Sequence, residues 1–205
     1  MSRKQEIVLL GAGGHCKSSI DVIENESIFS ILGIVDKDGS ITESVLDYDV
    51  IGTDKELESI IKRCPYVLVT VGQIKSPEIR ISLFKRSKAI GAIFPVIKSR
   101  TSYVSKSAQI GEGTILFHHT LINTSAQIGT NCIINSKALI EHDSEVGSNC
   151  HISTGAILNG GVIVEDRCFI GSRVIVHEGV KIGSDSIISA GAIVRKDTCN
   201  GTLLR

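Results

Sequence analysis

Between Val104 and Val194 the apolar residues of this chain recur with a period of six. Every sixth position in that stretch is aliphatic, without an insertion, and the position two residues earlier is almost always small. A repeat of this kind indicates a solenoid, in which each unit packs only against its neighbours. We interpret each hexad as one flat side and one corner of a three-sided β-helix, so that eighteen residues form a coil and coils stack about 4.8 Å apart. The repeat predicts about five coils, a rod roughly 25 Å long.

Two residue types inside the repeat receive a structural interpretation. Three cysteines are eighteen residues apart at the small position, and we expect them to lie one above another as small buried apolar residues. They are Cys132, Cys150 and Cys168. Glycines often follow the aliphatic position, where we expect the chain to turn tightly. They are Gly111, Gly129, Gly147, Gly171 and Gly183.

The first part of the chain follows another pattern, in which short apolar runs alternate with helix-period segments. This order predicts a parallel α/β sheet of the dinucleotide-binding kind. The predicted strands are 7–10, 32–35 and 66–71, and the predicted helices are 17–24, 54–63 and 77–90. We therefore expect a Rossmann-like domain at 1–95 that binds one nucleotide or nucleotide sugar, and a β-helix domain at 96–205.

A glycine-rich turn after the first predicted strand is the candidate phosphate site. Glycines there allow phosphate to approach a helix N-terminus closely, although Cys16 stands where the dinucleotide motif has its third glycine. Asp36 ends the second strand, where an acidic side chain commonly binds ribose hydroxyls, and Lys37 follows it. The alternative is a remnant fold without a ligand. The candidate binding residues are Gly11, Gly13, Gly14, His15, Asp36 and Lys37.

Composition argues against nucleic-acid binding, membrane association and secretion. Lys plus Arg and Asp plus Glu both number 22, so no bulk attraction to nucleic acid or to a membrane is expected. The first apolar run is too short for a signal peptide or a membrane span, and the six cysteines contain no CxxC pair. We expect a cytoplasmic protein without a metal site.

The hexad, the Gly11–His15 turn, and a segment 140–143 that precedes His151 together resemble the hexapeptide-repeat sugar acetyltransferases of surface-glycan biosynthesis. The resemblance implies a left-handed β-helix, acetyl-CoA as co-substrate, and a sugar or nucleotide-sugar acceptor. It also implies a homotrimer with active sites at the subunit interfaces and coenzyme A in the groove between neighbouring rods.

The resemblance also assigns roles to individual residues. His142 matches the catalytic base, since a histidine suits proton abstraction near neutral pH. Asp143 stands where the bacillosamine-type enzymes carry Glu, and it would orient the ring, with Glu141 as the alternative partner. His151 would contact the acetyl donor or the acceptor, and Gly160 would bring a backbone N–H to the thioester carbonyl. Ser172 and Ala190 would contact the pantetheine, and His177 could line the same groove.

Three functions stay open at this point. The first is N-acetylation of a nucleotide-linked 4-amino sugar. The second is O-acetylation of sialic acid or a related nonulosonic acid, which Asp36-Lys37 favours. The third is a non-catalytic or metal-binding β-helix. The family usually ends in a Gly-x-Pro-Ala loop that helps to cover the coenzyme, and this chain ends without that proline, which predicts weaker coenzyme binding or a different loop.

Overall fold

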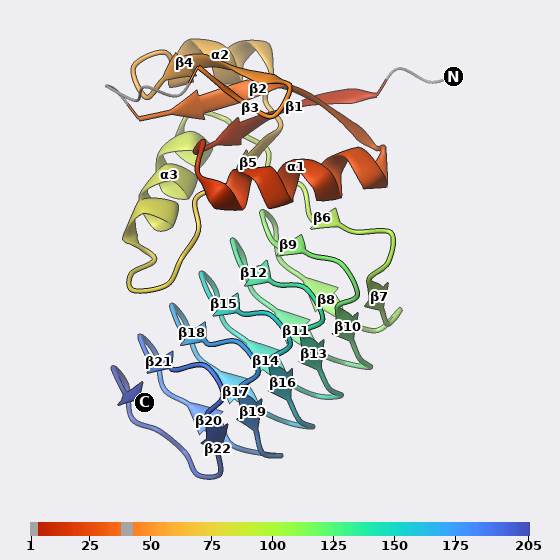
Figure 1. The fold of residues 1–205 in the computed structure, drawn as a ribbon, viewed down its shortest axis with the longest axis vertical. Helices are drawn as coiled ribbons and strands as arrows, with labels where there is room; N and C mark the ends of the chain where they lie inside the picture. Colours follow the sequence, from red (N-terminus) through yellow and green to blue (C-terminus); the bar gives the residue numbers. More distant parts are fainter. Residues whose placement is uncertain (1–3, 38–42) are drawn as a thin grey trace.

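The N-terminal domain is built on a five-stranded sheet with strand order β3-β4-β2-β1-β5 (Figure 1). The computed structural model describes residues 4–37 and 43–205. The sheet is parallel except for β3, which forms a hairpin with β4. The strands are β1 (Gln5–Leu10), β2 (Phe29–Asp36), β3 (Ser44–Val45), β4 (Tyr48–Thr53) and β5 (Val67–Val69).

Helices cover both sides of this sheet. α1 (Gly14–Glu26) packs on the side that faces the rest of the chain, while α2 (Leu57–Arg63) and α3 (Glu78–Ala89) share the core of the opposite side. The predicted strands and helices all form, but their bounds differ from those expected: β5 already ends at Val69, α1 begins three residues earlier and α2 begins three residues later. The β3–β4 hairpin was missed because exposed polar residues interrupt its alternation.

Below this domain the chain winds into a parallel β-helix (Figure 1). The coils stack on one another, and their strands form three sheets, which are the three sides of the rod. The sheet nearest the N-terminal domain, here the docked face, has seven strands. These are β6 (Ile97–Lys98), β9 (Ile115–Leu116), β12 (Ile133–Ile134), β15 (His151–Ile152), β18 (Phe169–Ile170), β21 (Ile187–Ile188) and β23 (Leu203–Leu204).

The other two sheets differ in what they present to solvent. One, the apolar face, points only apolar side chains outward; its strands are β7 (Tyr103–Val104), β10 (Leu121–Ile122), β13 (Leu139–Ile140), β16 (Ile157–Leu158), β19 (Ile175–Val176) and β22 (Ile193–Val194). The other, the polar face, points mostly polar side chains outward; its strands are β8 (Gln109–Ile110), β11 (Gln127–Ile128), β14 (Glu145–Val146), β17 (Ile163–Val164) and β20 (Lys181–Ile182).

The interior of the rod confirms the six-residue pattern. The second residue of each central strand points inward and is buried, and successive strands of one face pair in register eighteen residues apart, as Ile122 does with Ile140. Cys132, Cys150 and Cys168 are buried free thiols in this core, so their expected structural role is confirmed.

The expectation for the glycines was wrong. Gly111, Gly129 and Gly147 do not have positive φ; the left-handed turn positions lie elsewhere, every six residues from Gly113 to Gly191, and non-glycine residues such as Asp143 fill most of them. A Cβ on Gly129 would instead stand 2.6 Å from the Ser148 backbone nitrogen of the next coil. These glycines permit close stacking of coils rather than a turn.

Both ends of the rod depart from the repeat. The rod begins one strand before the aliphatic pattern does. In this first strand Lys98 occupies the position that pairs with Leu116, and its side chain is exposed because it lies at the open end of the rod. At the other end β23 pairs with β21 at a separation of sixteen residues. The proline-free tail therefore closes the rod with one more strand on the docked face.

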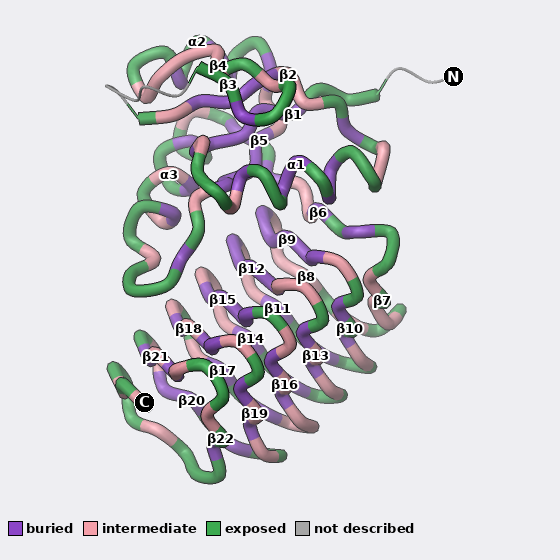
Figure 2. The backbone as a smooth tube through the Cα atoms, in the orientation of Figure 1, coloured by how far each residue is buried: buried purple, intermediate pink, exposed green. Residues whose placement is uncertain are grey.

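The two domains share a packed boundary. Ile115 and Ile133 of the docked face belong to the same buried cluster as Ile20 of α1, and Figure 2 shows β9 and β12 buried beneath the N-terminal domain. His118 adds a polar link: its Nε2 lies 2.6 Å from Asp21 Oδ2 in α1, and its Nδ1 lies 2.7 Å from Ser99 Oγ. The boundary fixes how the glycine-rich turn stands over the rod.

Candidate active site

His142 stands on the corner that joins the apolar face to the polar face. Its Nδ1 lies 2.8 Å from Asp143 Oδ2, and the two side chains are 61% and 67% exposed. A carboxylate only accepts, so Nδ1 carries a proton at this contact, and in the neutral form of the ring the lone pair is on Nε2. Asp143 adopts a φ of 60°, a left-handed conformation that Asp tolerates. Asp143 is therefore the ring partner.

Glu141, the alternative partner, is engaged elsewhere. Its Oε2 accepts from Asn123 Nδ2 at 2.6 Å and from the backbone nitrogen of His142 at 3.3 Å. It supports the corner of the rod, not the imidazole.

Gly160 lies one coil further along the same corner, against the His142 ring. A Cβ on Gly160 would stand 2.7 Å from His142 Nε2, so no other residue fits there without moving the ring. The Gly160 carbonyl accepts from Gly179, while its N–H meets no acceptor among residues 4–37 and 43–205. A lone pair and an unpaired N–H donor therefore lie side by side at this corner.

A second cluster lies in a cleft of about 1110 Å³ between the N-terminal domain and the docked face. The turn before α1 forms one end of the cleft. Gly13 caps α1 with an extended backbone, and the first turn of the helix has neither a side-chain cap nor an acidic residue, which leaves N–H groups available to an anion. Gly11 has a φ of 109°, and a Cβ there would stand 2.5 Å from Val71. The predicted residues Gly11, Gly13, Gly14, His15, Asp36, Lys37 and His151 all line this cleft.

Both histidines of the cleft are neutral. Burial lowers the pKa of His151 to about 4 and that of His15 to about 3, and the nearby Arg80 charge acts in the same direction. His151 Nδ1 donates to the Gln73 carbonyl at 2.6 Å, and the Nε2 atom of His15 has no partner within the described part of the chain. These rings can accept or donate a hydrogen bond without carrying charge.

Asp36 supports the glycine-rich turn as well as lining the cleft. Its Oδ1 accepts from the Ala12 nitrogen at 3.4 Å, while the Lys37 side chain is exposed. The carboxylate that ends β2 thus stands beside the turn that ends β1, as the sequence predicted.

Sequence reasoning missed two residues that hold the cleft in place. The buried Arg80 guanidinium donates to carbonyls of Val69 and Val71 and to Asn131 on the rod, at 2.6–3.1 Å. Gln73 Nε2 donates to the Asn149 carbonyl at 3.0 Å. The sequence does indicate that Arg80 is buried, because it is spaced along α3 so that it lies on the same buried face as Phe84 and Ser87. The contacts of Gln73 leave no local trace in the sequence.

Ser172 and Ala190 lie on a third site, the corner between the docked face and the apolar face. Ser172 Oγ is 3.0 Å from Ser153 Oγ, and Ala190 is exposed one coil further. Within one chain the proposed base, the cleft and this corner are therefore separate. The whole polar face lies between His142 and His151, since β14 runs between them.

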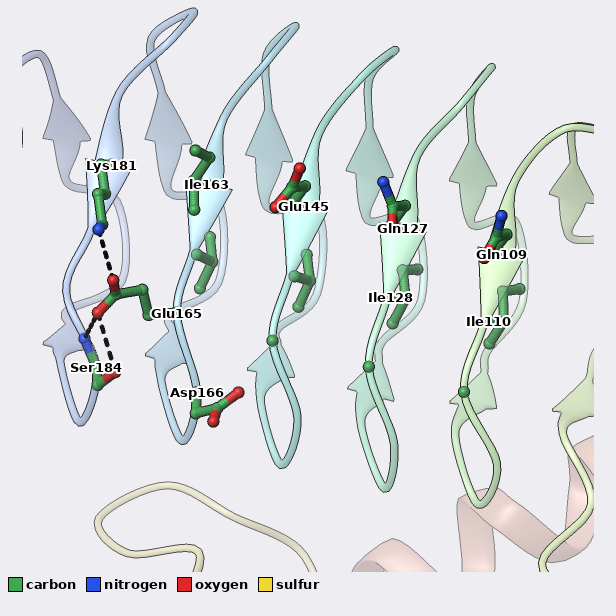
Figure 3. Close-up of a pocket in the computed structure, with 15 residues that line it drawn as sticks. Gln109, Ile110, Gln127, Ile128, Glu145, Ile163, Glu165, Asp166, Lys181 and Ser184 are labelled. Carbon is green, nitrogen blue, oxygen red and sulfur yellow. Dashed lines mark hydrogen bonds and ion pairs between the residues drawn. The ribbon is translucent and has the colours of Figure 1, made fainter.

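The polar face itself carries an open groove of about 820 Å³. Figure 3 shows Gln109, Gln127 and Glu145 on successive strands of this face. At its far end Glu165 accepts from Lys181 Nζ at 2.6 Å and from Ser184 at 3.0 Å, and these contacts lower the pKa of Glu165 to about 2. Glu165 takes the place that glycine holds in the neighbouring coils.

Among the described residues, no group of three or more His, Cys, Asp or Glu side chains is arranged to hold a metal ion. Across 4–37 and 43–205, none of the helices combines the length and the apolar character needed to span a bilayer.

Family models match both parts of the chain. Residues 6–87 match the PglD N-terminal domain, and residues 161–196 match the hexapeptide repeat of succinyl-transferase. No curated protein sequence gives a significant match.

Solved structures match along nearly the whole chain. PerB of Caulobacter crescentus, solved with CoA and GDP-perosamine, is 30% identical, with a TM-score of 0.88 over 95% of this chain and 91% of that one. Two further structures of that perosamine N-acetyltransferase carry a histidine replaced by asparagine or alanine. The acetyltransferase domain of PglB from Neisseria gonorrhoeae, solved with acetyl coenzyme A, is 26% identical, with a TM-score of 0.88 over 97% of this chain and 95% of that one.

These matches confirm the predicted fold, an α/β domain followed by a left-handed parallel β-helix, and the predicted enzyme class, an acyltransferase. The chain belongs to the hexapeptide-repeat sugar acetyltransferases that carry a PglD-type N-terminal domain.

Proposed function

We propose that this enzyme transfers the acetyl group of acetyl-CoA to the amine of a nucleotide-linked amino sugar, with His142 as general base. The observation that carries the proposal is the contact between the His142 ring and Gly160, which places a lone pair beside an unpaired N–H. The solved relatives, which include an N-acetyltransferase in complex with CoA and GDP-perosamine, favour an amine acceptor over a hydroxyl.

The residues at the corner supply what acetyl transfer requires. His142 Nε2 takes a proton from the acceptor nitrogen as that nitrogen bonds to the thioester carbonyl carbon. The Gly160 N–H donates to the carbonyl oxygen, which gains negative charge during the attack. The carbon–sulfur bond then breaks, and His142 returns the proton to the leaving thiolate. Asp143 holds the ring and stabilises its protonated form at 2.8 Å from Nδ1.

The cleft between the domains is the proposed acceptor site. The turn at Gly13 and Gly14 would bind the diphosphate through N–H groups at the start of α1, and Asp36 would accept from the ribose. The sugar would extend toward His151 and His15, which are neutral and line the same cleft.

A second copy of the chain is needed to complete this site, because His142 and the cleft of one chain lie on different sides of the rod. We propose a trimer in which the corner with His142 from one copy meets the cleft of its neighbour. Coenzyme A would lie between the rods, within reach of Ser172 and Ala190. The apolar face supports assembly, since water contact with such a stripe is unfavourable. Its outward residues are Tyr103, Leu121, Leu139, Ile157, Ile175 and Ile193, of which Tyr103 is 60% exposed in the single chain.

Thiol release from acetyl-CoA tests the reaction. The assay compares nucleotide-linked 4-amino sugars with free and CMP-linked sialic acids as acceptors. We expect release only with the amino sugars, matched by one acetamide per thiol in the product. Release with sialic acid alone would replace this proposal by O-acetylation.

Mixed trimers test the shared site. H142A lacks the base and G13D blocks the phosphate turn, so each variant alone should be nearly inactive. Refolded or co-expressed mixtures should recover activity, because some interfaces then combine an intact corner with an intact cleft. No recovery in a mixture that forms trimers by sedimentation would contradict a site shared between copies. L121E should yield monomers, whereas D49K, an exposed change on β4, should leave the trimer intact.

A further inference from the structure

The end of the cleft away from the rod carries three charged side chains where two neighbouring strands end. β2 and β4 are parallel, and Asp36 is paired with Thr53 in their register. The residues that follow each strand, Lys37 and Asp54, therefore stand side by side at the carboxyl edge of the sheet. Asp36, Lys37 and Asp54 all line the cleft.

An apolar wall from α3 faces this edge. Ile79 and Leu83 lie one turn apart on the helix and both line the cleft, and Ile79 is 65% exposed. Arg86, on the same side of α3 as Leu83, has its Nη1 3.4 Å from Asp54 Oδ2. The ion pair ties the wall to the carboxylate, so a flat ring resting on Leu83 would turn its edge toward Asp54.

The strand order sets the order in which the parts of a nucleotide meet the protein. In the sheet β2 lies between β1 and β4, and neighbouring strands are about 4.8 Å apart. The turn after β1 takes phosphate and Asp36 after β2 takes ribose. The next strand outward, β4, thus presents Asp54 where the base must lie.

We propose that Asp54 and Lys37 select guanine, so that the acceptor is a guanosine-diphosphate-linked amino sugar; this inference rests on the proposed function. A carboxylate only accepts hydrogen bonds, and guanine offers it two adjacent donors, N1–H and the N2 amino group. Lys37 only donates, and guanine offers it O6 beside N1, with N7 next to it. Asp54 would thus face the two hydrogen-bond donors of guanine, and Lys37 would face its two acceptors.

The other bases do not match this arrangement. Uracil has a single N–H between two carbonyl oxygens, which would face the carboxylate. Adenine turns an amino group toward Lys37 and a ring acceptor toward Asp54. A site built to hydrogen-bond one base discriminates strongly against a base that leaves its charged groups unpaired.

Calorimetric titration of the full chain with nucleoside diphosphates tests the proposal, and inosine diphosphate is the sharpest probe because it lacks only the N2 amino group. We expect GDP to bind at least tenfold more tightly than UDP, CDP or ADP, and about tenfold more tightly than IDP. D54N should bring GDP and IDP to within about twofold of each other while leaving UDP binding unchanged. D49N, the same change on the exposed side of β4, should behave as the unmodified chain.

The outcomes separate this inference from the function on which it rests. Equal binding of GDP and UDP, or a GDP preference that survives in D54N, would overturn the assignment of Asp54. Transfer of acetyl to UDP-linked amino sugars in preference to GDP-linked ones would overturn the guanine assignment and leave the acetyltransferase proposal standing. Absence of transfer to every nucleotide-linked amino sugar would remove both.

Discussion

The imidazole of His142 lies against the α-carbon of Gly160, with Nε2 2.7 Å from the point where a Cβ would stand. The contact follows from the rod itself, because residues eighteen apart occupy the same corner of successive coils. One coil supplies the proposed proton acceptor, and the next supplies a backbone amide whose N–H is unpaired within the described residues. The chemistry proposed for this enzyme depends on that spacing.

Replacing His142 by alanine should lower kcat by about 10²–10⁴-fold with little change in KM for either substrate, because general-base catalysis is lost while binding groups remain. The side chain is 61% exposed, so folding should be unaffected by circular dichroism. Steady-state thiol release measures the effect. H119N, a change at an exposed corner position, is the control, and equal kcat in both variants would exclude His142 as the base.

Replacing Gly160 by alanine should lower kcat about 10–10³-fold, because the added methyl displaces the His142 ring and crowds the donor N–H. The double variant H142A/G160A shows whether the methyl group acts by displacing the His142 ring or by a separate effect on the Gly160 N–H. If the methyl acts chiefly through the ring, the double variant should be little slower than H142A alone, a non-additive result typical of residues in contact. Fully multiplied losses would indicate that Gly160 acts independently of His142.

The positions of the candidate residues around the rod could be predicted from their separations in the sequence, since one coil contains eighteen residues. The separation of His142 from Gly160 is one coil, and that of Ser172 from Ala190 is also one coil, so each pair was correctly expected to stack. His151 follows His142 by nine residues, which is half a coil and places it across the rod. The same separation therefore shows that one chain cannot bring the two histidines together, which agrees with the active sites at subunit interfaces that the family resemblance implies.

What the sequence did not predict depends on contacts between distant segments. Gln73 bonds to Asn149 and Arg80 to Asn131 across the domain boundary, and periodicity describes only neighbours within an element. The first strand of the rod, β6, was not predicted because Lys98 stands where the repeat has an aliphatic residue. At the open end of the rod this side chain is exposed and need not be apolar. The glycines were misread because a missing Cβ serves a turn or a close approach equally well, and only the stacked backbone distinguishes the two.

Stability should fall with acid between pH 6.5 and about 4, and His151 is one of the two buried histidines that cause this fall, the other being His15. Burial holds the pKa of His151 in the folded chain near 4, below the unfolded value of 6.5, so in this window the unfolded chain binds a proton that the folded chain does not. The free energy of unfolding is therefore full above pH 6.5 and declines on acidification, by about 3 kcal/mol for this group. Urea unfolding at several pH values measures it. H151N keeps a donor toward the Gln73 carbonyl and does not titrate, so its pH dependence should be shallower. An unchanged slope would mean that other groups dominate the acid response.

Replacing Arg80 by methionine should lower the free energy of unfolding by about 2–4 kcal/mol. Burial lowers the pKa of this guanidinium to about 10, which still leaves it charged at neutral pH, and its donors satisfy carbonyl and amide oxygens on both sides of the domain boundary. Methionine keeps most of the volume, so the loss isolates the hydrogen bonds from a cavity. Because Val71 precedes Gln73, whose carbonyl holds His151, nucleotide affinity should fall as well. R63M, on the exposed surface of α2, should change stability by less than about 0.5 kcal/mol. A similarly small effect of R80M in urea unfolding would show that the loop from Val71 to Gln73 holds its position without the buried cation.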